Sequence, residues 1–278
     1  MAIVLVIIGF IVGGVLLGQD LIRSAETRAT ISQIEKYNTA VNTFRGKFNA
    51  LPGDLNGQVA TQFGFAARGA LPGEGDGNGI MESVYGTNGT TYGCLETVGE
   101  NAMFWVDLTT ANGLNLNLID GGFNTANSTT QPATPSIITG TGLNLYLPEA
   151  KLGRGSYIYV WSQNSVNYFG ISGISKLYNY GALYAYRSIT VRQSYDMDTK
   201  IDDGLPQSGR ITAQALLSQN PGWLGASDTS ATGGGPGTCY DNSSGAAWWT
   251  GINGATQHYS IEVNNGNGAN CELSFQFQ

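Results

Sequence analysis

Residues 1–54 read MAIVLVIIGFIVGGVLLGQDLIRSAETRATISQIEKYNTAVNTFRGKFNALPGD. The stretch up to Gly18 has no charged or strongly polar side chain, and as a helix it would be about 27 Å long, close to the bilayer core of about 30 Å. A cleaved signal peptide fits less well, because no basic segment precedes the apolar run and no small-residue cleavage pattern follows Gly18. A plain membrane anchor would explain the hydrophobicity but not the pattern that comes next.

Residues 19–48 predict an amphipathic helix that continues the apolar one. Apolar residues recur in steps of three and four at Ile34, Tyr37, Val41, Phe44 and Phe48. No Pro or Gly interrupts residues 19–45, and Pro52 disfavours helix at Leu51. We therefore expect one rod of about 70 Å over residues 1–51, hydrophobic and then amphipathic, followed by a separate globular head over 52–278.

The head has the pattern of a sheet domain with long loops. The chain contains 40 glycines and only 12% charged residues, and short apolar runs alternate with turn-forming residues. Strands are expected at Tyr157–Trp161, Tyr168–Ile174 and Cys271–Phe277, and short helices at Asn101–Ala111 and Ile189–Ile201, the second with Ser188 as N-cap. Residues 123–139 read as a surface loop. The expected fold class is α+β, with the long helix packed against an antiparallel sheet.

The charge distribution argues against a nucleic-acid-binding surface. The net charge is −7, and only 13 Lys and Arg residues are spread along the chain, whereas phosphate neutralisation requires clustered cations. Residues 20–47 are nevertheless mildly basic, and the acidic excess lies in the head.

Three cysteines indicate one disulfide. Cys239 and Cys271 bracket a Gly- and Asn-rich stretch, and a bridge between them would stabilise it by about 3–4 kcal/mol. Cys94 is then left over, and the pairings Cys94–Cys239 and Cys94–Cys271 remain open at this stage.

Two acidic loops are candidates for calcium. Residues 74–79, EGDGNG, resemble the first half of an EF-hand loop, but Tyr85 occupies the position of the final bidentate ligand. In the second loop four carboxylates fall within eight residues, at Asp196, Asp198, Asp202 and Asp203. The alternative for both loops is turn and cap hydrogen bonding, which Asp also favours. Calcium is the only cofactor that the sequence suggests.

Catalysis is not expected. His258 is the only histidine, and no nucleophile-elbow motif or phosphate-binding loop occurs. Trp248, Trp249, His258 and Tyr259 lie between Cys239 and Cys271, where they could either pack under the loop or form an exposed adhesive surface.

The N-terminal run ending in LPGD resembles the helix of type IV pilins and type II secretion pseudopilins. The resemblance covers about the first fifty residues. It implies a subunit that is processed by a prepilin peptidase, waits in the inner membrane, and is added by the pilus assembly machinery to an extracellular homopolymer. The implied filament core comprises Ile3, Val4, Ile7, Ile8, Gly9, Phe10, Gly13, Gly14, Leu17 and Gly18.

The chain departs from that family at two points. The methylated aromatic residue and the glutamate that follow the peptidase site are absent. Either about five mature residues precede Met1, or the N-terminus diverges from the family. No proline precedes Pro52, so in a filament the helix would either stretch near Gly9–Gly18 or stay continuous. The Gly9/Gly13 and Gly14/Gly18 spacings also allow close helix approach.

The resemblance makes a major pilin serving attachment, motility or DNA uptake the leading expectation. A periplasmic pseudopilin uses the same kind of helix and is the alternative. A membrane-tethered adhesin is a third interpretation, from a different class.

Overall fold

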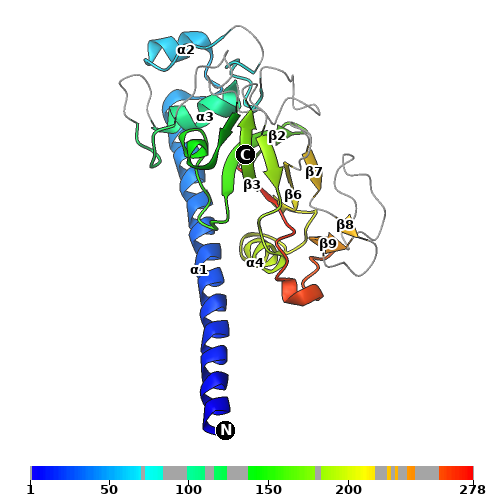
Figure 1. Cartoon of the computed structure of the whole chain (residues 1–278). Helices are drawn as coiled ribbons and strands as arrows, with labels where there is room; N and C mark the ends of the chain where they lie inside the picture. The colour runs from blue at the N-terminus through cyan, green and yellow to red at the C-terminus, as the bar shows by residue number, and fades with distance from the viewer. Residues whose placement is uncertain are drawn as a thin grey trace.

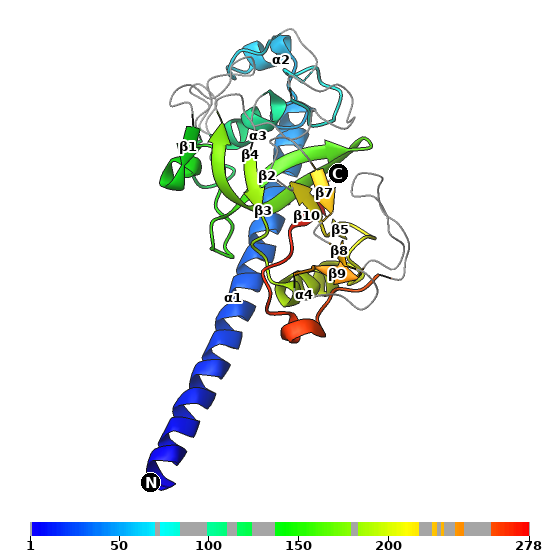
Figure 2. The same ribbon diagram turned by 45° about the vertical axis from the view of Figure 1, so that its right-hand side comes forward.

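The structure is a computed structural model and describes residues 2–69, 73–83, 99–109, 116–123, 137–178, 183–216, 224–226, 229–230, 237–241 and 257–277. One long helix runs along a head and projects far beyond it, so that the N-terminus lies at the free end of a rod (Figure 1). The sheet and the shorter helices gather around the other half of this helix, as the turned view in Figure 2 also shows.

The elements follow one another in a simple order. The helices are α1 (Ala2–Phe48), α2 (Gly57–Gln62), α3 (Glu100–Thr109) and α4 (Val191–Ile201), with 3-10 turns η1 (Gly140–Leu145) and η2 (Val263–Gly266). The strands are β1 (Ile137–Thr139), β2 (Ser156–Gln163), β3 (Val166–Tyr178), β4 (Leu183–Tyr186), β5 (Ile211–Thr212), β6 (Gln214–Leu216), β7 (Leu224–Ala226), β8 (Thr229–Ser230), β9 (Tyr240–Asp241) and β10 (Leu273–Gln276). A long N-terminal helix followed by a largely antiparallel head is the predicted α+β arrangement.

Helix α1 is continuous and ends where the sequence predicts. It passes through Gly9 to Gly18 without interruption. At its end Asn49 takes a left-handed backbone conformation, with φ of 54°, and its N–H bonds the Arg45 carbonyl at 2.8 Å. Asn tolerates this conformation better than most residues, and Pro52 follows closely, so the chain turns away from the helix axis here.

The main sheet is built around β3. This strand pairs antiparallel with β1, β2, β4 and β10, and β5 joins the far side of β10. Phe169 faces both Val160 of β2 and Phe275 of β10, so these two strands lie on opposite edges of β3. Two further two-stranded sheets, antiparallel β6–β7 and parallel β8–β9, lie beside it.

The second half of α1 forms part of the head's core. Its apolar stripe is almost fully buried at Ile34, Tyr37, Ala40, Val41 and Phe44. The ring of Tyr37 packs 5.1 Å from that of Trp105 on α3 and 6.1 Å from that of Phe169 on β3. These contacts hold the second half of α1 against both α3 and the sheet.

Most local predictions are confirmed, with two corrections. The expected strands Tyr157–Trp161 and Tyr168–Ile174 lie within β2 and β3. The expected strand Cys271–Phe277 contains the shorter β10, and the two expected helices correspond to α3 and α4. The predicted N-cap Ser188 is wrong: Thr190 caps α4 by accepting from the Gln193 N–H, because Ser188 is part of an extended segment whose N–H bonds the Cys271 carbonyl.

The predicted loop 123–139 is also wrong at its end. Ile137–Thr139 form β1, in which Ile138 is buried and pairs with Leu177. Residues 124–136 lie outside the described residues.

Candidate functional site

The most unusual surface of the molecule is the free half of α1. Large apolar side chains are exposed all the way around it, at Ile3, Val4, Val6, Ile7, Ile8, Phe10, Ile11, Val12, Val15, Leu16, Leu17, Leu21 and Ile22. Ile3 is 76% exposed and Phe10 78%. Among the described residues, α1 is the one helix long and apolar enough to cross a membrane, a property that a signal sequence shares. Water is a poor solvent for such a surface, so lipid or protein must cover it.

The expected filament-core residues all lie on this surface. The large ones, Ile3, Val4, Ile7, Ile8, Phe10 and Leu17, are more than half exposed. A Cβ added at Gly9, Gly13, Gly14 or Gly18 would meet nothing within 4 Å, so these positions are open notches along the rod. The exposed apolar surface continues beyond Gly18 to Leu21 and Ile22.

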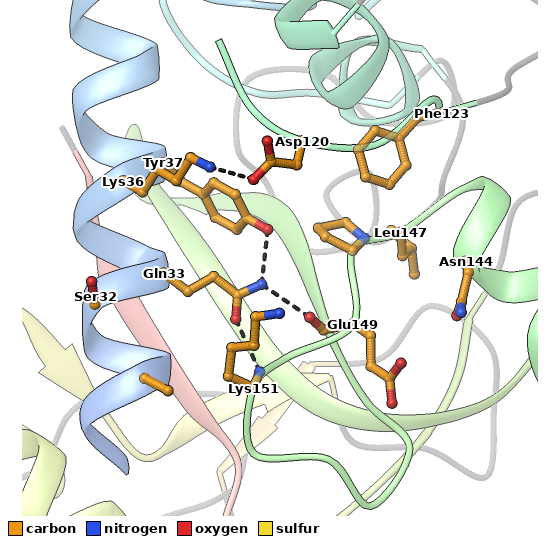
Figure 3. A pocket seen from close by; sticks show the side chains of 12 residues that line it. Ser32, Gln33, Lys36, Tyr37, Asp120, Phe123, Asn144, Leu147, Glu149 and Lys151 are labelled. Carbon is orange, nitrogen blue, oxygen red and sulfur yellow. Dashed lines mark hydrogen bonds and ion pairs between the residues drawn. The ribbon is translucent and has the colours of Figure 1, made fainter. Parts of the chain in front are cut away.

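Polar contacts fix the junction of α1 with the head. The Gln33 amide donates to the Glu149 carbonyl and the Tyr37 hydroxyl, both at 2.9 Å, and its oxygen accepts from the Lys151 N–H at 3.0 Å (Figure 3). These bonds border a cavity of about 450 Å³, which the Lys36–Asp120 ion pair also lines. The Gln33 side chain therefore links α1 by hydrogen bonds to Glu149 and Lys151, in the segment before β2.

A second set of polar contacts involves α1 closer to its N-terminus, at Glu26. The Glu26 carboxylate accepts a 3.0 Å hydrogen bond from the Gln193 amide of α4 and lies 3.6 Å from the Arg154 guanidinium. Arg154 also donates to the Gln193 oxygen at 3.1 Å. The helix, the turn before β2 and the start of α4 thus meet in one polar network.

The first candidate calcium loop contributes to a different carboxylate group from the one predicted. Asp76 meets Asp54 and Glu100, which are distant in sequence and were not predicted, whereas Glu74 is not a member of this group. Sequence spacing could not show this, because Glu100 lies on α3 and Asp54 follows α1.

Backbone N–H groups donate hydrogen bonds to two of these carboxylates. Asp54 accepts from the N–H groups of Gly77 and Gly79, each at 2.7 Å, and Glu100 accepts from Gly75 and Glu82. Burial raises the pKa of Asp54 to about 6 and that of Glu100 well above its usual value. The arrangement therefore folds the glycine-rich loop around two buried carboxyl groups.

The second candidate loop brings three of its four carboxylates together. Asp198, Asp202 and Asp203 lie close enough for one ion, but Asp196 is two residues from Asp198 on α4 and faces α1 instead. The predicted four-carboxylate set is wrong in this respect, because positions two apart lie on different faces of a helix.

Protein donors also satisfy this cluster. Asp198 accepts from the Gly204 N–H and the Tyr259 hydroxyl, and Asp203 accepts from the Leu205 N–H and the Ser208 hydroxyl. The Ile211 N–H donates to Asp202 at 3.0 Å. These bonds match the turn-forming alternative for the loop.

The predicted disulfide is present between Cys239 and Cys271, whose Cα atoms are 4.9 Å apart. Tyr259 is buried beside it and His258 is exposed. Cys94, Trp248 and Trp249 lie outside the described residues, so the predicted aromatic cluster is described only in part.

Comparison with protein-family models, with curated proteins and with solved structures finds no match to this chain.

Proposed function

We propose that this chain is the structural subunit of an extracellular helical filament of the type IV pilin class, held in the inner membrane by α1 before assembly. One observation carries the proposal: a single continuous helix is apolar and exposed around its first half, and buried along one stripe in its second half. A membrane covers the first half before assembly, and the same halves of other copies cover it in the filament.

The packed junction between rod and head supports polymerisation over simple anchoring. A tether needs only a span and a flexible linker, whereas here the span continues into the core of the head through Tyr37 and Phe44. A rod fixed in this way gives each head a defined position when the rods bundle. Repetition of one such contact yields an open helical polymer, because a non-closing contact between identical subunits can repeat without limit.

The notches at Gly9, Gly13, Gly14 and Gly18 fit this role. Within a membrane no hydrophobic effect drives helices together. Small residues favour helix association there because they let the two backbones pack closely. Whether α1 stretches at these glycines in the filament stays a prediction, since the single chain has a continuous helix there.

Electron microscopy of material sheared from expressing cells tests the proposal, with the helical core resolved. The Ile8→Asp variant places a carboxylate in the middle of the apolar half and should abolish fibres, because an ionised Asp at the centre of a span costs about 2.5–3.5 kcal/mol. Thr141→Asp adds the same charge to an exposed position of the head and should leave fibres intact. Membrane-bound monomers without fibres in the wild type would overturn the filament and leave a tethered display protein.

A further inference from the structure

A polar cleft opens where α1 leaves the head. It has a volume of about 570 Å³ and lies between residues 16–27 of α1 on one side and α4 with the η2 segment on the other. Figures 1 and 2 both show α4 beside α1, with the red η2 turn next to α4, at the end of the head nearest the free rod. The cleft therefore sits between the exposed apolar half of the helix and the folded head.

The backbone of η2 is shaped to form one wall. Asn264, Asn265 and Gly266 are all left-handed, with φ of 50°, 52° and 69°. A Cβ on Gly266 would lie 2.9 Å from the Arg192 backbone nitrogen, so the turn is fitted tightly against the start of α4. This conformation places Asn267 within reach of the Arg23 guanidinium, which donates to its side-chain oxygen.

Four charged side chains line the cleft, two of each sign: Asp20, Arg23, Arg192 and Asp196. Within the described part of the chain, the side chains of Asp20, Arg192 and Asp196 make no hydrogen bond or ion pair. Because these three charged groups line one cleft and have no partner there among the described residues, both signs of charge are available to a ligand.

The position of the cleft along the rod fixes its depth in a bilayer. The uncharged part of α1, from Ala2 to Gly18, is about 26 Å long, close to the hydrocarbon core of about 30 Å, and Asp20 is the first charged residue beyond it. Leu16, at the end of the cleft nearest the N-terminus, then lies in the hydrocarbon. Arg23 lies just outside the hydrocarbon. The charged part of the cleft is thus level with the lipid headgroups.

We propose that this cleft binds the headgroup of a zwitterionic phospholipid that carries a phosphate and a primary ammonium, as phosphatidylethanolamine does. Arg23 and Arg192 donate to the phosphate, since guanidinium groups pair well with phosphate oxygens. Asp20 and Asp196 accept from the ammonium. The inference rests on the membrane-bound stage of the proposed function.

The charges of the cleft distinguish this headgroup from the other common ones. Its two cations and two anions cancel, which gives no advantage to a headgroup with a net negative charge. A quaternary ammonium donates no hydrogen bonds and is recognised by aromatic faces, and none of the side chains around this cleft is aromatic. A primary ammonium donates three hydrogen bonds, which carboxylates accept.

Native mass spectrometry of the full chain in detergent micelles tests the assignment. The micelles contain equal amounts of phosphatidylethanolamine, phosphatidylcholine and phosphatidylglycerol with identical acyl chains. We expect the ethanolamine lipid to be retained about tenfold more than the choline lipid, which corresponds to about 1.4 kcal/mol. Arg192→Gln and Asp196→Asn should each remove this preference, whereas Arg45→Gln, at the opposite end of α1, should keep it.

Four outcomes would overturn the assignment. Equal retention of all three lipids, or variants that behave like the wild type, would show that the cleft does not select a headgroup. A preference for phosphatidylglycerol, or displacement of bound lipid by inorganic phosphate, would show an anion site without an ammonium site. Near-ultraviolet circular dichroism of each variant confirms that the head is folded.

Vesicle flotation separates this proposal from the proposed function. If the wild type floats with vesicles and forms fibres but shows no headgroup preference, only the lipid assignment fails. If the wild type does not float with vesicles of any composition, the membrane-bound stage itself fails, and the lipid assignment with it.

Discussion

The Tyr259 hydroxyl donates a 2.8 Å hydrogen bond to Oδ2 of Asp198, a carboxyl group with no exposed surface. Burial raises the pKa of Asp198 to about 7, whereas an Asp in an unfolded chain has a pKa of about 3.9. Between these values the folded head holds a proton that the unfolded chain has released. The contribution of Asp198 to the free energy of unfolding therefore falls as the pH rises from about 4 to about 7, and is level above that.

Asp198→Asn should reduce this pH dependence and stabilise the head at pH 8 by roughly 2 kcal/mol. A shift of about three pKa units is worth about 4 kcal/mol, and the amide loses part of the hydrogen bonding that the carboxylate accepts. Urea denaturation of the full chain in micelles at pH 5 and pH 8 measures it. Asp203→Asn, in the exposed part of the same loop, is the matched control. A variant with the same pH dependence as the wild type would refute the prediction.

The Arg68–Asp107 ion pair should be far more important for stability than the Lys36–Asp120 pair. Arg68 and Asp107 are at most 1% exposed and 2.6 Å apart, and Asp107 also accepts from the Gly53 N–H at 2.7 Å. Arg68→Met leaves a buried carboxylate without its cation and should cost about 3–5 kcal/mol.

Lys36→Met removes the cation of an exposed pair, whose side chains are 48% and 96% exposed, and should cost less than about 1 kcal/mol. Chemical denaturation of both variants checks the difference. Equal losses would mean that the buried pair is solvated in solution.

Glycine to alanine substitutions should have opposite effects on stability at two positions. A Cβ at Gly170 would lie 2.3 Å from the Tyr159 ring, whose hydroxyl is bonded to Ser172, so Gly170→Ala should cost about 1–3 kcal/mol. Gly46 lies in α1 with nothing within 4 Å, so Gly46→Ala should gain about 0.5 kcal/mol. Thermal unfolding measures both, and a stable Gly170→Ala variant would show that Tyr159 can move.

The disulfide should account for a large part of the stability of the C-terminal region. It joins two fully buried cysteines 32 residues apart, for which loop closure predicts a loss of about 3–4 kcal/mol in the Cys239→Ser/Cys271→Ser variant. Denaturation with and without reductant measures this. Reductant should destabilise the wild type and leave the double variant unchanged, and an equal response in both would contradict the prediction.

Local sequence signals were sufficient where one segment determines its own structure. The stripe from Ile34 to Phe48 and the LPGD sequence located α1 and its end, and the alternating β-branched and aromatic residues located β2 and β3. Each signal lies within a few residues, so the sequence could carry it without knowledge of the fold.

Groups assembled from distant segments could not be found in this way. Asp54, Asp76 and Glu100 meet only because α3 packs across the end of α1. The polar cleft between α1 and α4 is likewise lined by residues of α1 and by residues more than 160 positions later. Asp196 was wrongly predicted to join the carboxylate cluster because its segment was treated as a loop, although Asp196 lies on α4.

The position of β10 sets the order in which the molecule can be completed. Phe275 pairs with both Phe169 of β3 and Ile211 of β5, and the ring of Phe277 lies 4.4 Å from that of Phe169. The head cannot close until these late residues leave the ribosome. At about 5–20 residues per second, that happens on the order of 10–50 seconds after α1 has been made. The hydrophobic half of α1 can thus reach a membrane long before the head folds. During that interval the unpaired edge of β3 can pair with a wrong strand.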